Sequence, residues 1–241
     1  MEERKVRRLI RLISLAALQL LAFGVQAETF SNISGSVVDF PLGAVSFADE
    51  LVDFSPGLVF DPDRGVNTPL PEYLDGTNTL GAPDVTLEQA VACSINPSTE
   101  TCRFVSLGQA GSLTVKFVDN FLTGSDDSAA DLFIFEAGPQ DEIFIDISAD
   151  SINWVELGAF ASLTAGVDLD GFGFGRQDLF SYVRLRDNPD VGQIQGDTLG
   201  ADIDAIGAIS TVLVPLPGAA WLMLSALVTL LLRRSASRTR A

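Results

Sequence analysis

The sequence predicts an all-β protein, an antiparallel β-sandwich that is flanked by one apolar helix at each end of the chain. Three observations lead to this class: short runs with period-two patterning fill the middle of the chain, turn-forming residues separate these runs, and helical spacing is nearly absent. Many short strands without intervening helices favour two antiparallel sheets packed face to face. We divide the chain into an N-terminal signal peptide helix (1–27), one exported β-sandwich domain (28–213) and a C-terminal segment with a transmembrane helix (214–241).

The individual strands follow from the period of their side chains. SLTVKFVD (112–119) alternates apolar and polar residues, as a half-buried strand does, whereas DLFIFEAG (131–138) is continuously apolar at its centre, as a strand covered on both faces is. Further strands are expected in EIFIDIS (142–148), NWVELG (153–158), YVRLRD (182–187) and DIDAIGAIST (202–211). One short helix is expected around 87–92, and the residues before Gly81 are expected to supply an edge strand and a covering loop.

The charge of the chain is distributed very unevenly. Between Glu28 and Leu213 there are six basic residues against thirty acidic ones, a net charge of −24, while most basic residues lie at the two ends. Such a surface repels nucleic acid and attracts cations, so no nucleic-acid partner is expected. The chain also has no histidine, which excludes Ser-His-Asp and Cys-His catalysis and every imidazole metal site.

The N-terminus has the form of an export signal. Basic residues are followed by an apolar stretch (12–23) and then by Val25-Gln26-Ala27, which places small residues where signal peptidase needs them and predicts cleavage after Ala27. The alternative is an amphipathic helix or membrane anchor. In an oxidising compartment Cys93 and Cys102, which flank a turn-rich loop, are expected to form a disulfide; the alternative is two free thiols.

The C-terminus has the form of a membrane anchor. The apolar stretch 216–232 has about the minimum length that spans a hydrocarbon core, and the arginines that follow it predict an orientation with the C-terminus in the cytoplasm. Two prolines directly before the stretch prevent a helix from continuing into the body. We therefore expect this segment to anchor the chain in a membrane, with the large domain before it exported.

The same tail resembles a known sorting signal. VPLPGAAWLMLSALVTLLLRRSA (214–236) is similar to the PEP-CTERM signal in order, spacing and terminal placement, through Val214-Pro215-Leu216-Pro217 and the pair Arg233-Arg234; Gly218 stands where this variant often has alanine. The resemblance implies a Gram-negative bacterium in which an exosortase recognises the tail, cuts near the Pro-x-Pro and releases or transfers the body to the cell surface. It also implies an association with extracellular polysaccharide and biofilm.

The body resembles secreted bacterial jelly-roll-like domains that often precede this kind of tail. The shared pieces run in order from Gly81 to Ile209: LGAPD, VSLGQAGSLTVKFVDN, DLFIFEAG, ISADSINWVELG, YVRLRD and ADIDAIGAI. Ser151 departs from the pattern, which usually has a turn glycine there, so this hairpin is expected to be looser or of another turn type. The resemblance implies a fold and a location, and it does not indicate an activity.

Acidic residues near the expected strand ends suggest a calcium site. Calcium takes carboxylate, amide and main-chain oxygens in flexible geometry, and an exported protein without histidine offers these ligands readily. The preferred group, expected to converge at one end of the sandwich, is Asp119, Asn120, Asp131, Asp202 and Asp204. The alternative is a solvated acidic surface. Asp168-Leu169-Asp170-Gly171 lacks the remaining ligands of an EF-hand loop and is expected to be a turn.

Aromatic residues and carboxylates leave two further functions open. Phe172 and Phe174, between glycines and followed by Arg176, could contact a ligand such as a sugar, or the two rings could tuck under the sandwich. A pair of carboxylates could hydrolyse glycosides, but so acidic a chain always contains candidate pairs. The sequence therefore predicts a non-enzymatic, exosortase-processed surface or matrix protein, associated with exopolysaccharide and stabilised by Ca²⁺. The alternatives are a lectin-like module and a carboxylate-based glycoside hydrolase.

Overall fold

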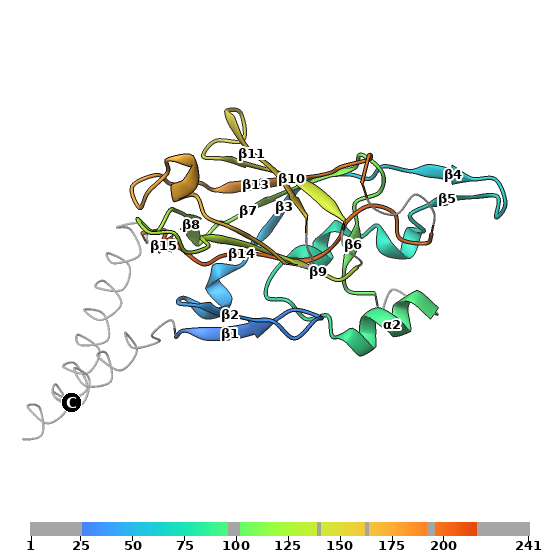
Figure 1. Ribbon diagram of the computed structural model, residues 1–241, viewed down its shortest axis with the longest axis horizontal. Coiled ribbons are helices and arrows are strands. Elements are labelled where there is room, and N and C mark those ends of the chain that lie inside the picture. Colours follow the sequence, from blue (N-terminus) through green and yellow to red (C-terminus); the bar gives the residue numbers. More distant parts are fainter. Residues whose placement is uncertain (1–25, 96–101, 139–140, 162–163, 192–195, 216–241) are drawn as a thin grey trace, which may run out of the picture.

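The computed structural model describes residues 26–95, 102–138, 141–161, 164–191 and 196–215 (Figure 1). Its strands are β1 (Glu28–Ser31), β2 (Val37–Phe40), β3 (Glu50–Ser55), β4 (Val59–Asp61), β5 (Val66–Thr68), β6 (Val105–Ser106), β7 (Ser112–Lys116), β8 (Asn120–Leu122), β9 (Leu132–Glu136), β10 (Glu142–Ser148), β11 (Trp154–Ala161), β12 (Thr164–Val167), β13 (Tyr182–Asp187), β14 (Asp202–Ala208) and β15 (Thr211–Leu213). The helical segments are α2 (Leu87–Ile95) and the short 3₁₀ turns η1 (Gly43–Ser46), η2 (Pro71–Tyr73), η3 (Gly76–Thr79) and η4 (Asp170–Phe172).

The two expected terminal helices lie almost entirely outside these ranges. This applies to the apolar part of the signal peptide, to the apolar stretch 216–232, and to Leu216, Pro217, Arg233 and Arg234 of the sorting motif, whereas Val214 and Pro215 are described. In the ranges that the structure describes, no helix has both the length and the apolar character needed to cross a membrane.

Two antiparallel sheets form the body, which confirms the all-β sandwich. One sheet has the strand order β11-β10-β13-β7-β3 and the other the order β12-β9-β14-β6. Smaller two-stranded pairings, β1-β2, β4-β5 and β15-β8, lie around them (Figure 1). The predicted edge strand before Gly81 is β3, at the edge of the five-stranded sheet.

The core lies between the two sheets and follows from the alternation seen in the sequence. Leu113 and Val115 of β7 are fully buried and pack in one cluster with Leu132 and Ile134 of β9 and Ile206 of β14. Because every second residue of a strand points to the same face, one side of each sheet supplies the apolar layer. The strand β9 is buried along its whole length, as its continuous apolar run predicts.

The helix α2 begins where it was expected and ends three residues later than Ala92. Cys93 therefore lies on the helix, and its disulfide to Cys102 is confirmed, with a Cα–Cα distance of 5.3 Å. Both cysteines are buried in a small cluster with Tyr73 and Phe104, and the Tyr73 hydroxyl donates a hydrogen bond to the Cys93 carbonyl (3.1 Å).

The turn of the β10–β11 hairpin accommodates Ser151 at the position where the resembling domains usually have glycine. Ser151 has a φ of +58°, the left-handed conformation that glycine adopts most easily. Local hydrogen bonds hold the turn: Ser148 Oγ accepts from the Ser151 N–H (3.0 Å), and Asp150 Oδ1 accepts from the N–H groups of Ile152 and Asn153 (2.9 and 2.8 Å). Serine therefore adopts here a conformation typical of glycine, and these hydrogen bonds support it.

Candidate metal centre

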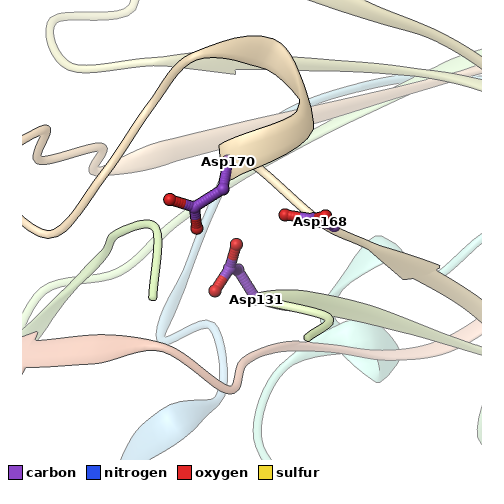
Figure 2. A group of neighbouring side chains, drawn as sticks. All are labelled: Asp131, Asp168 and Asp170. Atoms are coloured by element: carbon purple, nitrogen blue, oxygen red, sulfur yellow. The ribbon is translucent and has the colours of Figure 1, made fainter. Parts of the chain in front are cut away.

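Three carboxylates gather at one end of the four-stranded sheet. Asp131, Asp168 and Asp170 each offer one oxygen, and these three oxygens lie within 4.8 Å of one another. Figure 2 shows the Asp131 side chain pointing from the start of β9 toward the two others, which come from the segment after β12.

The strand pairing brings these residues together. In the β12–β9 pair Val167 lies opposite Leu132, so Asp131, directly before β9, and Asp168, directly after β12, are neighbours across the sheet. The main chain of Asp131 fixes this end, because its N–H donates to the Val167 carbonyl (2.8 Å) and its carbonyl accepts from the N–H groups of Ile209 and Ser210 (2.6 and 3.1 Å). Asp170 then begins η4.

Asp131 is buried without a full set of hydrogen bonds. Its Oδ2 accepts from the Leu169 N–H (2.8 Å), whereas its Oδ1 is buried and has no hydrogen-bond partner. Burial raises the pKa of Asp131, and the Leu169 N–H and the nearby hydroxyls of Ser210 and Ser125 oppose this rise. A buried carboxylate oxygen without a partner is costly, and a bound cation is one way to compensate it.

The other two carboxylates are half-buried and only partly used. Asp170 Oδ2 accepts from the Ser125 N–H (2.8 Å), the Ser125 hydroxyl (3.2 Å) and the Asp126 N–H (3.2 Å). Asp168 Oδ1 accepts from the Gly171 N–H (3.3 Å). Within the described ranges, no lysine or arginine makes an ion pair with any of the three aspartates, so their charges are not neutralised by the protein. The arrangement is suited to hold a metal ion.

The predicted five-residue site is wrong as a single group, because sheet topology separates its members. β9 and β14 are antiparallel, with Ala208 opposite Leu132 at one end and Ile203 opposite Glu136 at the other. Asp131 therefore lies beside the end of β14, whereas Asp202 and Asp204 lie at its start. The sequence shows that each residue is near a strand end but does not show which end.

Asp119 and Asn120 have other roles. Asp119 is exposed, and its carbonyl accepts a hydrogen bond from the Val214 N–H (2.7 Å). Asn120 is buried at the start of β8, where its Nδ2 donates to the Thr211 hydroxyl (2.8 Å) and its Oδ1 has no partner. Both residues help to position β15 against β8.

Asp202 and Asp204 belong to a set of buried acids at the opposite end of the sheet. The Ser106 hydroxyl donates to Asp202, and Asp204 accepts from the N–H groups of Asp84 and Val85 (3.3 and 3.4 Å). A register shift between Ile203 and Ala205 interrupts the regular strand at Asp204. Burial raises the pKa of both Asp202 and Asp204 to about 7.

The loop with Phe172, Phe174 and Arg176 presents only one of its rings to solvent. Phe172 is 44% exposed, whereas Phe174 packs against the core and lies edge-to-face on Phe180 with ring centroids 5.1 Å apart. Gly173 has a φ of +88° and makes the reversal between the rings possible. Of the two alternatives for this loop, an outward ring describes Phe172, and a ring tucked under the sandwich describes Phe174.

The sequence interpretation missed Asp168 and Asp170 as candidate ligands. It expected a turn in this segment, and η4 is one, but the same turn directs two carboxylates toward Asp131 (Figure 2). The available signal was two acidic residues directly after one strand and a third directly before another. That signal becomes informative only once the two strands are known to pair.

Comparisons with known proteins give only distant structural likenesses. No family model matches the chain, and no curated protein matches it. Among solved structures, the chain is similar to the C-terminal domain of a chitobiase from Bacteroides fragilis, with 15% identity, a TM-score of 0.36, and coverage of 70% of this chain and 98% of that one. It is also similar to a glycoside hydrolase, with 8% identity, a TM-score of 0.30, and coverage of 74% and 38%. Likeness at this level is too distant to indicate a shared activity.

Proposed function

We propose that this chain is an exported, non-enzymatic surface or matrix protein whose β-sandwich binds one Ca²⁺ through Asp131, Asp168 and Asp170. The observation that carries the proposal is the buried Oδ1 of Asp131, which has no hydrogen-bond partner and lies beside two further carboxylates. The ion would join the start of β9 to the segment after β12, and so stabilise the end of the sheet.

The kind of ligand favours calcium over magnesium. Calcium takes several oxygen ligands in flexible geometry, whereas magnesium demands a nearly ideal octahedron and gives up its water molecules reluctantly. Three carboxylates from a strand end and a turn, with one oxygen each within 4.8 Å of the others, suit the less demanding ion better. The absence of histidine argues against zinc, which prefers nitrogen and sulfur ligands.

The location and the partners in this proposal come from the sequence. The disulfide between Cys93 and Cys102 is in keeping with an oxidising compartment, and thus with an exported body. The resemblance of residues 214–236 to a PEP-CTERM signal supports processing by signal peptidase and an exosortase, passage through the inner membrane of a Gram-negative bacterium, and an extracellular polysaccharide as neighbour. A carboxylate-based glycoside hydrolase stays a weaker alternative, supported only by the abundance of acids.

Thermal unfolding of the purified full-length chain in detergent tests the calcium site. With excess EGTA and then with millimolar calcium, we expect the midpoint to rise. A ligand at a hundredfold excess over its dissociation constant adds about 2.7 kcal/mol of stability, or about 5–11 °C for a domain of this size. Millimolar magnesium should give a much smaller shift.

Two substitutions and one control connect the shift to the site. Asp131→Asn and Asp168→Asn should each remove most of the calcium shift, because each takes away a charged ligand. Asp63→Asn removes an exposed carboxylate that accepts no hydrogen bond from the described residues, so it should keep the shift. Superimposed EGTA and calcium curves for the unsubstituted chain would overturn the proposal, as would an undiminished shift in both site variants.

A further inference from the structure

A cavity of about 450 Å³ lies directly beside the candidate metal centre. Ser125 and Ser210 line it, and both also hold the centre in place. Ser125 donates from its N–H and its hydroxyl to Asp170, and the Ser210 N–H donates to the Asp131 carbonyl. The cavity and the metal centre therefore share a wall.

Part of the cavity lining carries hydrogen-bonding groups. Among the described residues, four with hydroxyl side chains line the cavity, together with Arg176. The Arg176 Nε donates to the Ser125 carbonyl (2.7 Å) and lies 3.3 Å from Asp126 Oδ2, which fixes the guanidinium at one edge. Its two terminal amino groups make no hydrogen bond or ion pair within the described part of the chain, and the side chain is 64% exposed. They are available as a pair of donors for a ligand oxygen.

The remaining lining of the cavity is apolar. Leu42 and Val212 contribute to it, and Val212 is 46% exposed although it belongs to β15. A cavity with apolar walls and a few fixed donors and acceptors is the usual form of a small-molecule site. A pyranose ring presents C–H groups on its faces and hydroxyls at its rim, so it matches both kinds of wall.

The charges around the cavity favour a neutral ligand. Among the described residues that line the cavity, Arg176 alone is charged, and it is paired with Asp126. The Ser125 N–H donates to Asp170, and the Ser125 hydroxyl lies within hydrogen-bond distance of both Asp127 and Asp170, so two carboxylates lie beside this part of the lining. Since the body also carries a strong net negative charge, a uronate or a sulfated sugar would be repelled.

We propose that this cavity binds one neutral sugar residue of a polysaccharide, with Arg176 as a hydrogen-bond donor and Val212 against the ring. This inference rests on the proposed association with extracellular polysaccharide and names the ligand class and the site for it. Phe172, exposed on the same loop as Arg176, does not line the cavity.

Isothermal titration of the full-length chain, in detergent with calcium, tests the inference. The probes are hexasaccharides of a β-1,4-glucan, a β-1,4-mannan and a dextran, with an alginate hexasaccharide as the acidic comparison. We expect saturable binding of at least one neutral probe and weaker or no binding of alginate. Loss of the donors in Arg176→Ala should weaken the binding by about tenfold or more, whereas Arg103→Ala, which removes an exposed arginine outside the cavity, should leave it unchanged.

A second pair of variants keeps the test independent of Arg176. Val212→Glu introduces a larger, charged side chain into the lining, and Val212→Gln introduces an uncharged one of similar size. Both should weaken binding of the neutral probe. The inference would be overturned if none of the neutral probes binds, or if alginate binds more tightly than they do. It would also be overturned if the Arg176 and Val212 variants bind the neutral probe as tightly as the unsubstituted chain. A calcium shift in unfolding without sugar binding refutes only this inference, whereas sugar binding without a calcium shift refutes only the metal site.

Discussion

Glu136 offers a quantitative test of how the buried acids affect stability. It is the last residue of β9, is 5% exposed, and its Oε1 is buried without a hydrogen-bond partner. Burial, followed by repulsion from Asp141 and Asp202, raises the pKa of Glu136 to about 9. We expect the folded protein to hold this side chain protonated at neutral pH.

The direction of the pH effect follows from the raised pKa. The unfolded chain releases this proton near pH 4.5, whereas the folded chain keeps it until about pH 9. The stabilisation from the bound proton is therefore complete below pH 4.5 and is lost as the pH rises toward 9. One group changes the free energy of unfolding by at most about 1.4 kcal/mol per pH unit, which amounts to about 3 kcal/mol by pH 7.

Urea unfolding of the unsubstituted chain and of Glu136→Gln at pH 5, 7 and 8.5 measures this effect. Glutamine has nearly the same shape and stays neutral, so the stability of the variant should fall less steeply, by about 1.4 kcal/mol per pH unit. Asp187 and Asp204, whose pKa values burial raises to about 6 and about 7, are not among the groups that shift the pKa of Glu136, so they titrate in both proteins and cancel in the comparison. Parallel pH profiles for the two proteins would refute a strongly raised pKa for Glu136.

Two further predictions concern packing and the disulfide. Replacing both Cys93 and Cys102 with alanine should lower the free energy of unfolding by about 2–3 kcal/mol, because the disulfide restricts the unfolded chain; an unchanged urea midpoint would contradict this. Gly207→Ala should cost about 1–3 kcal/mol, measured the same way, since its Cβ would lie 2.6 Å from Phe40 Cε1 and 2.8 Å from Phe47 Cε1 in a fully buried aromatic cluster. A variant as stable as the parent would show that these rings can move apart.

The disulfide and the strands were predictable because they depend on local features of the chain. A period of two in 112–119 and the continuous apolar run of 131–138 identify a half-buried strand and a fully covered one. The helix near residue 87 and the Cys93–Cys102 bridge follow from short sequence separations. The position of Ser151 at a turn was also visible, although its positive φ was not.

The candidate metal centre was only partly predictable because it depends on pairing between distant strands. Asp131 was chosen correctly as a residue at a strand end, but Asp202 and Asp204, chosen on the same ground, lie at the other end of the antiparallel pair. Asp168 and Asp170 were set aside because their own segment lacks a complete loop motif, and the third carboxylate comes from more than thirty residues earlier in the chain.

The sequence by itself determined the all-β class, the positions of the main strands along the chain, the acidic character and the disulfide. These features depend on composition and on side-chain patterns that extend over a few neighbouring residues. The tertiary structure alone decided which strand ends meet, and with them the group Asp131, Asp168 and Asp170 and the cavity beside it. Register and strand direction place distant residues in contact, and a list of acidic residues near strand ends does not contain that information.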